Sequence, residues 1–122
     1  MKLTNTEIYS YALALNKAFT DNSQRLPVKV GFYLQKNKNN LIELARGIEE
    51  SRMEIIRNYG SQVKNTDQYQ IDADKVDIAQ KELNDLLDLE QEVTIYKVNI
   101  DTIPDDLILT AEQMEAMMFM ID

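Results

Sequence analysis

Residues 27–60, PVKVGFYLQKNKNNLIELARGIEESRMEIIRNYG, form one uninterrupted helical pattern, and this stretch decides the fold. Its apolar side chains recur at helical spacing and include Leu34, Leu41, Ile48 and Ile55, one every seven residues. Pro27 suits the first turn of a helix, and Gly60 suits the left-handed residue that ends one. At about 1.5 Å per residue the helix would extend for roughly 50 Å, which is longer than a domain of this size is wide. We expect the remaining elements to pack along it and to bury Leu41, Ile48 and Ile55.

The residues before this stretch predict a shorter helix. Thr4 and Glu7 match a capping box, and Ile8, Ala12, Leu15 and Phe19 follow on one helical face. Residues 21–23, Asp-Asn-Ser, predict its end. Because only about five residues then remain before Pro27, the two helices should be antiparallel or sharply angled neighbours.

The residues after Gly60 predict a loop, a helix, a ribbon and a closing helix. Residues 61–71 are polar and non-periodic, and 72–74 (Asp-Ala-Asp) open an acidic helix. Residues 92–100 are β-branched and aromatic, and 106–109 are the other extended candidate, so we expect these two to pair. Thr110 and Gln113 form a second capping box.

Together these patterns predict a mainly α fold with a small β ribbon, in a single helical domain over residues 1–122. A long central helix would be packed by an antiparallel N-terminal helix, a third acidic helix, a short two-stranded ribbon and a C-terminal helix. A glycine inside a helix costs about 1 kcal/mol relative to alanine. We therefore expect another backbone or a bulky aromatic side chain to lie close to Gly47.

The composition argues against several function classes. The 122 residues include no cysteine and no histidine, which excludes thiolate chemistry and removes the commonest general base and metal ligand. The three glycines are scattered, so no phosphate-binding loop is predicted. We predict no enzyme, with no catalytic, metal-binding or cofactor-binding residues and no cofactor. No apolar run approaches the roughly 20 residues that span a bilayer, and the first residues lack a secretory signal pattern, so we expect a cytosolic protein with no membrane partner.

The charge is acidic and uneven. The formal net charge is −8, yet residues 1–60 hold nine basic and six acidic side chains, and residues 61–122 hold four and fifteen. The predicted acidic surface consists of Asp72, Asp74, Asp77, Glu82, Asp85, Asp88, Glu90 and Glu92. Such a surface attracts a basic partner, or it only keeps the protein in solution. Four cations, Arg25, Lys29, Lys36 and Lys38, surround Phe32 and Tyr33, but the overall charge makes nucleic acid an unfavourable partner.

The closing helix is rich in methionine. Met114, Met117, Met118 and Ile121 form one face, which would leave Phe119 and Met120 pointing away from it. Methionine-rich surfaces adapt to varied apolar partners. We therefore predict a partner or homo-oligomer interface at Met114, Met117, Met118, Phe119 and Met120, the alternative being that the main face simply closes the core.

Nearly the whole chain resembles a known group of proteins. The runs 26–30 (LPVKV), 48–52 (IEESR) and 55–60 (IIRNYG), followed by 82–87, 92–95 and 109–121, resemble small proteins of unknown function encoded by tailed phages and prophages, mostly of Gram-positive hosts. Residues 61–71 are shorter than the Asp-Gly-Asn loop of that group. The group has no assigned catalytic residues, so the resemblance implies a phage origin and a role through protein contacts.

Two hypotheses follow. The first is a non-enzymatic phage accessory protein that acts through protein–protein contacts with a phage or host protein, in the host cytoplasm or in the virion. The alternative is an acidic inhibitor of a host nucleic-acid-binding defence enzyme, which would act by mimicking the charge of DNA.

Overall fold

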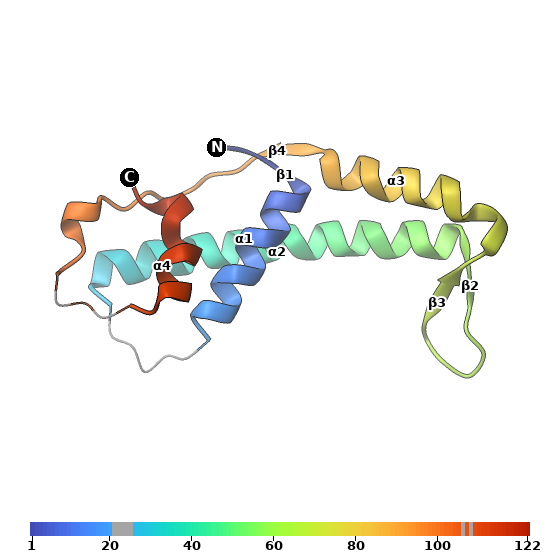
Figure 1. The fold of residues 1–122 in the computed structure, drawn as a ribbon, viewed down its shortest axis with the longest axis horizontal. Helices are drawn as coiled ribbons and strands as arrows, with labels where there is room; N and C mark the ends of the chain where they lie inside the picture. The colour runs from blue at the N-terminus through green and yellow to red at the C-terminus, as the bar shows by residue number, and fades with distance from the viewer. Residues whose placement is uncertain (21–25, 106, 108) are drawn as a thin grey trace.

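The computed structural model describes residues 1–20, 26–105, 107 and 109–122. The 31-residue helix α2 (Val28–Asn58) runs from one end of the molecule to the other (Figure 1). Helix α1 (Asn5–Ala18) packs across α2, and α4 (Ala111–Met117) packs against α1; these helices and the first half of α2 form the part that we call the head. Helix α3 (Val76–Asp88) runs back along the second half, which we call the arm. The mainly helical fold around a long central helix is therefore confirmed.

Capping boxes begin two of the helices, as predicted. The Thr4 side chain accepts a hydrogen bond from the Glu7 backbone N–H at 3.1 Å, and the Glu7 carboxylate accepts one from the Thr4 N–H at 3.0 Å. Thr110 and Gln113 repeat this arrangement at the start of α4. Helix α1 ends at Ala18, and the end predicted at 21–23 lies outside the described residues.

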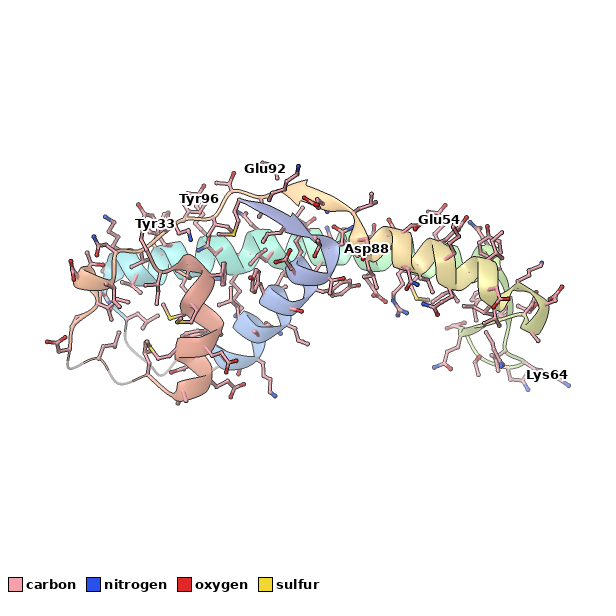
Figure 2. The ribbon with its side chains drawn as sticks, turned by 45° about the horizontal axis from the view of Figure 1, so that its top comes forward. Tyr33, Glu54, Lys64, Asp88, Glu92 and Tyr96 are labelled. Carbon is pink, nitrogen blue, oxygen red and sulfur yellow. The ribbon has the colours of Figure 1, made fainter. Side chains whose placement is uncertain are left out.

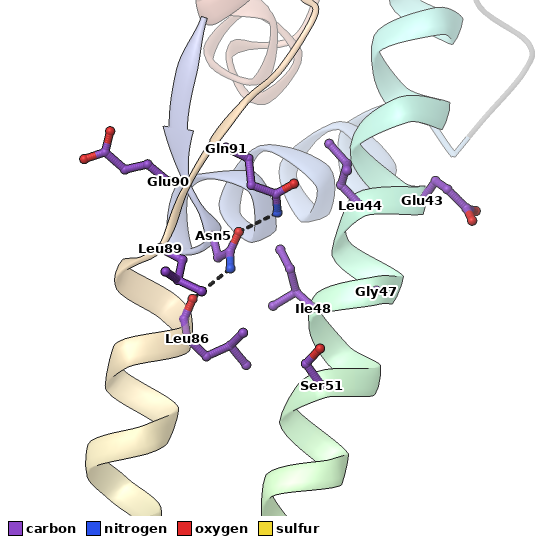
Figure 3. Close-up of a pocket in the computed structure, with 10 residues that line it drawn as sticks. All are labelled: Asn5, Glu43, Leu44, Gly47, Ile48, Ser51, Leu86, Leu89, Glu90 and Gln91. Carbon is purple, nitrogen blue, oxygen red and sulfur yellow. Dashed lines mark hydrogen bonds between the residues drawn. The ribbon is translucent and has the colours of Figure 1, made fainter.

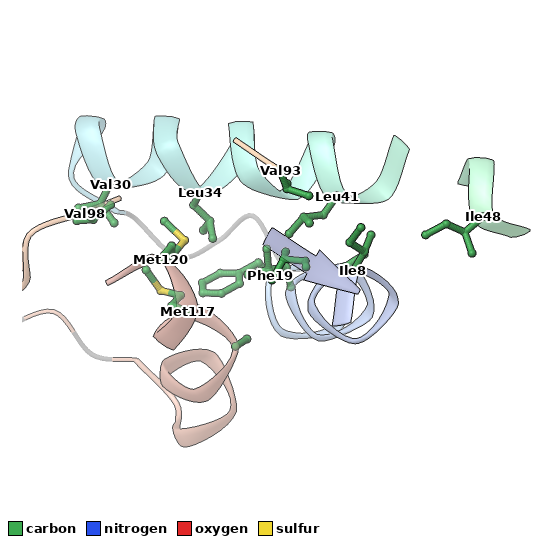
Figure 4. Packing of buried hydrophobic residues seen from close by; sticks show 14 residues of the cluster. Ile8, Phe19, Val30, Leu34, Leu41, Ile48, Val93, Val98, Met117 and Met120 are labelled. Atoms are coloured by element: carbon green, nitrogen blue, oxygen red, sulfur yellow. The ribbon is translucent and has the colours of Figure 1, made fainter. Parts of the chain in front are cut away.

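The hydrophobic core fills the head (Figure 4). Its fully buried side chains come from α1, α2, the extended segment 93–98 and the C-terminal residues, and the largest are Ile8, Leu15, Val30, Leu41, Val98, Met117 and Met120. Ile48 is the last buried residue of α2, whereas Ile55 is only half-buried against α3. The expected burial of Ile55 is therefore wrong, because beyond Ile48 a single helix covers the apolar stripe.

The predicted pairing of 92–100 with 106–109 is wrong. Strand β4 (Glu90–Glu92) pairs antiparallel with β1 (Lys2–Thr4) at the N-terminus, with Leu3 opposite Gln91. Residues 93–98 continue as extended chain whose backbone is bonded by side chains and by the C-terminus. Buried Asn37 of α2 binds both the N–H and the C=O of Tyr96, at 2.8 and 2.9 Å. Of the second predicted strand, residues 106 and 108 lie outside the described part, and the Leu107 N–H donates to Pro104 in a turn.

The predicted loop 61–71 contains a hairpin. Strands β2 (Gly60–Gln62) and β3 (Tyr69–Ile71) pair antiparallel at the tip of the arm, and the connection includes Asn65 at φ 65°. Gly60 does not have the left-handed conformation that we expected. A glycine is needed there because a Cβ atom would lie 2.5 Å from the Ile56 carbonyl oxygen and 2.6 Å from that of Gln70. After this hairpin, the predicted third helix begins with a 3-10 turn, η1 (Ala73–Lys75), that leads into α3.

The orientation predicted for the closing helix is also wrong. Helix α4 ends at Met117 and continues as a 3-10 turn, η3 (Met118–Met120). With three residues per turn, Met117 and Met120 share one face, and both are fully buried. The backbone of Val98 bonds to Met120 and Asp122, which adds the chain's last residues to the head.

A polar cluster joins α1 to α2. The Tyr9 hydroxyl donates to the Glu49 carboxylate, which also receives two hydrogen bonds from Arg52 at 2.9 and 3.0 Å. Burial and the bond to Glu49 raise the pKa of Tyr9 to about 12, while the bonds from Arg52 and Tyr9 lower the pKa of Glu49 below its ordinary value of 4.5. The cluster therefore favours the charged carboxylate and the neutral phenol.

We predict that Leu41→Ala will lower the free energy of unfolding by about 2–5 kcal/mol, because Leu41 is fully buried among head residues. Ile55→Ala should cost less, since its side chain is half-buried. Urea unfolding measures both values, with Ile42→Ala on the exposed side of α2 as the control. Equal costs for Leu41 and Ile42 would contradict this packing.

We predict that the Tyr9–Glu49–Arg52 cluster makes stability depend on pH. The lowered pKa of Glu49 gives stability that is complete above 4.5 and is lost as the pH falls through and below that value. The raised pKa of Tyr9 gives stability that is complete below 10.0 and is lost as the pH rises towards about 12. Denaturant unfolding across this range should show a shallower acid loss for Glu49→Gln and a shallower alkaline loss for Tyr9→Phe. Identical profiles for the variants and the wild type would contradict the cluster's role.

Candidate binding cleft

The five residues that were predicted as an interface on the closing helix do not lie together on one exposed surface. Met117 and Met120 are fully buried, and the Phe119 ring stacks on Tyr11 with the ring centroids 4.6 Å apart. Met118 is 64% exposed and Met114 37%. The protein's own core therefore uses three of these five residues, and the other two, Met114 and Met118, face solvent.

The predicted acidic residues fall into two groups. Asp74, Asp77, Asp85 and Asp88 are exposed, lie along α3 and the turn before it, and take part in no ion pair between described residues. The other four have partners: Asp72 binds Ser61 and Lys75, Glu82 accepts a bond from Tyr59, Glu90 pairs with Lys2, and Glu92 pairs with the N-terminal ammonium.

The cations near Phe32 and Tyr33 contact aromatic rings. The Lys36 ammonium lies 5.7 Å from the Phe32 ring centroid and 6.0 Å from that of Tyr96, and Tyr33 and Tyr96 lie together at the head (Figure 2). Arg25 lies outside the described residues. The contacts of Lys36 and Tyr33 with Tyr96 join segment 93–98 to α2, whereas Phe32 stays 56% exposed.

A hollow that no sequence pattern predicts lies where the head meets the arm (Figure 3). It lies between α2 on one side and the end of α3 with β4 on the other, and has a volume of about 390 Å³. Its lining consists of Asn5, Glu43, Leu44, Gly47, Ile48, Ser51, Leu86, Leu89, Glu90 and Gln91. We call it the Gly47 cleft. A second hollow of about 280 Å³ adjoins it, shares Glu43 and Leu44, and extends along β4 to Thr94.

Gly47 is an exposed residue on the α2 wall of the cleft. A Cβ atom at this position would meet nothing within 4 Å, although Gly47 lies in the middle of α2. Our expectation of a close backbone or aromatic neighbour is therefore wrong. Gly47 destabilises α2 by about 1 kcal/mol relative to alanine. No contact among the described residues requires a glycine at this position.

The buried side chain of Asn5 fixes the cleft walls. Its amide nitrogen donates to the Leu86 carbonyl at 2.7 Å, and its side-chain oxygen accepts from the Gln91 amide at 2.7 Å. The Asn5 backbone N–H donates to the Leu89 carbonyl at 2.8 Å. Three bonds from one residue therefore hold the end of α3 and the start of β4 in place, so the cleft is formed before any partner binds.

The lining is suited to contact with an apolar or basic group. Leu44, Ile48, Leu86 and Leu89 supply aliphatic surface, and Leu89 is 58% exposed. Glu43 and Glu90 also belong to the lining, although their carboxylates point outward from its two walls (Figure 3), and the cleft is lined by no lysine or arginine. Among the described residues, no group of three or more acidic side chains is arranged to hold a metal ion.

Another groove, of about 460 Å³, lies between α1 and α4. The Lys17 ammonium and the Glu112 carboxylate, 4.0 Å apart, both line it. Leu13 is its main exposed apolar residue, at 69%. We favour the Gly47 cleft because it combines fixed walls with a glycine that the fold does not require.

Comparisons with known proteins supply no family. Neither the family models, nor the curated proteins, nor the solved structures contain a match to this chain. Within the described residues, no helix is both long and apolar enough to cross a membrane.

We predict that the three glycines will respond differently to alanine. Gly47→Ala should raise the free energy of unfolding by about 0.5–1 kcal/mol, because the helix is favoured and the Cβ meets nothing. Gly31→Ala should behave similarly, since its nearest neighbour, the Leu26 Cβ, would lie at an ordinary 3.7 Å. Gly60→Ala should cost about 1–3 kcal/mol through its two carbonyl contacts. A destabilised Gly47→Ala in urea unfolding would show that the cleft is closed.

Proposed function

We propose that this chain is a non-enzymatic accessory protein of a tailed phage that acts by binding another protein in the Gly47 cleft. The observation that carries the proposal is the open environment of Gly47. A glycine that destabilises its helix and touches nothing leaves room for a partner, because a side chain at this position would occupy the cleft. The sequence resemblance to phage proteins supports the origin, and the host cytoplasm or the virion is the proposed location.

The chemistry of the cleft supports binding over catalysis. The chain has no histidine or cysteine, and the lining offers aliphatic, amide, hydroxyl and carboxylate groups. Glu43 lies on α2 and Glu90 on β4, and each is in an ion pair, with Arg46 and with Lys2. Neither is placed beside a nucleophile that it could activate.

The proposal is tested with two leucine variants. Tagged wild type, Gly47→Leu and Asn39→Leu are recovered from phage-producing cells, and the bound proteins are quantified by mass spectrometry. Gly47→Leu places a side chain in the cleft, whereas Asn39→Leu adds the same side chain at an exposed position of α2 outside it. We expect a partner that is retained by wild type and by Asn39→Leu and reduced at least ten-fold with Gly47→Leu. Purified virions, analysed in parallel, show whether the protein is a component of the particle.

The result that contradicts the proposal is equally specific. If Gly47→Leu folds normally and recovers the same proteins in the same amounts as Asn39→Leu, the cleft is not the binding site. Exposed Met114 and Met118 and the groove between α1 and α4 would then be candidates for a partner or for self-association.

The exposed aspartates favour a second candidate function, inhibition of a host nucleic-acid-binding defence enzyme by charge mimicry. Asp74, Asp77, Asp85 and Asp88 lie within fifteen consecutive residues, and the first and last are separated by about 21 Å of helical rise. DNA carries about one charge per 1.7 Å, so four carboxylates reproduce roughly a third of its charge over that length. This low density makes mimicry the weaker proposal. Its signature is binding that weakens steeply as salt rises, and salt-independent binding contradicts it.

A further inference from the structure

Strand β4 has one paired edge and one unpaired edge. The Asn5 N–H donates to the Leu89 carbonyl, and the Val93 N–H donates to the Met1 carbonyl, both at 2.8 Å. In an antiparallel pair, alternate residues bond to the neighbouring strand, so Leu89, Gln91 and Val93 face β1. The N–H and C=O groups of Glu90 and Glu92 therefore point away from β1, and no described residue outside the ladder bonds to them.

The unpaired edge borders the cleft. Glu90 and Gln91 line the Gly47 cleft, and Glu92 lines the adjoining hollow, with Leu44 of α2 opposite in both. In Figure 3, the Gln91 side chain points from β4 toward α2, and the Glu90 side chain points away from α2. The open space is therefore next to backbone groups that have no partner, which is the arrangement that accepts an added strand.

The charges around this edge select the strand that can be added. Glu43, Glu90 and Glu92 are the charged residues that line the two hollows. Their ion pairs, with Arg46, Lys2 and the N-terminus, join exposed groups and are weak. A second copy of β4 would place glutamates opposite glutamates, which disfavours self-pairing. Lysine or arginine opposite Glu90 and Glu92 would be favourable instead.

We propose that the partner inserts an extended segment, antiparallel to β4, with alternating basic and apolar side chains. Its basic residues lie opposite Glu90 and Glu92, on the outer face of the sheet. Its apolar residues point inward, as Leu3 and Val93 do, and contact Leu44 and Ile48 beside Gly47. This inference rests on the proposed function and adds the shape and chemistry of the bound segment.

The first test uses a capped, labelled peptide, Val-Lys-Val-Lys-Val-Lys, and two backbone-methylated forms. In antiparallel pairing the lysines carry the N–H groups that face β4, so N-methylation of the lysines should weaken binding at least ten-fold. N-methylation of the valines should change binding less than three-fold. The amides of Glu90 and Glu92 should exchange hydrogen at least ten-fold more slowly when the unmodified peptide is bound, with those of Gln91 and Val93 unchanged. No saturable binding, equal binding by the two methylated forms, or unchanged exchange at Glu90 and Glu92 would overturn the inference.

The second test changes the protein. Glu90→Pro removes an N–H that the fold does not use, and Leu89 already has φ −61° and ψ 138°, which suits the residue before a proline. We expect Glu90→Pro to bind the peptide and the cellular partner at least ten-fold more weakly, and the matched Glu90→Ala less than three-fold more weakly. If Gly47→Leu loses the cellular partner while Glu90→Pro retains it, strand insertion is wrong and the proposed function stands. If Gly47→Leu also retains it, the proposed function is wrong too.

Discussion

The hydrogen bonds of Asn5 are the interaction on which the arrangement of head and arm depends. Asn5 is the first residue of α1, yet its partners, Leu86, Leu89 and Gln91, lie more than 80 positions later in the chain. Because its side chain is buried and its donors and acceptors are used there, replacing it would leave buried polar groups without partners. The open cleft is thus a consequence of how α3 is attached to the head.

The length of α2 explains why such an attachment is needed. At about 1.5 Å per residue, α2 extends for roughly 46 Å, and the hydrophobic core that it shares with α1, segment 93–98 and the C-terminal residues ends at Ile48. Along the second half, α3 has one fully buried side chain, Ala79, while Val76 and Ile78 stay about half exposed. The arm therefore contributes little core of its own. Its hydrogen bonds to the head and the hairpin at its tip hold the returning chain beside α2.

Local signals in the sequence predicted the helices, and tertiary contacts decided the rest. The capping boxes at Thr4 and Thr110 and the stripe through Leu41 depend on residues a few positions apart, so periodicity and caps were sufficient. The pairing of β1 with β4 joins residues near opposite ends of the chain, which no local pattern encodes. The cleft was beyond prediction for the same reason. Gly47 was noticeable as a glycine inside a helix, but its open surroundings depend on where Asn5 places α3 and β4.

The central claim, that a partner protein occupies the Gly47 cleft, is tested most directly by site-specific photo-cross-linking in phage-producing cells. A photoreactive amino acid is placed, one position at a time, at Ser51 in the cleft, at Asp85 on the outer face of α3 and at Met118 on the exposed part of the C-terminal turn. We predict a cross-link to one defined protein from Ser51 and none to that protein from Asp85 or Met118. A cross-link from Asp85 or Met118, with none from Ser51, would contradict the account.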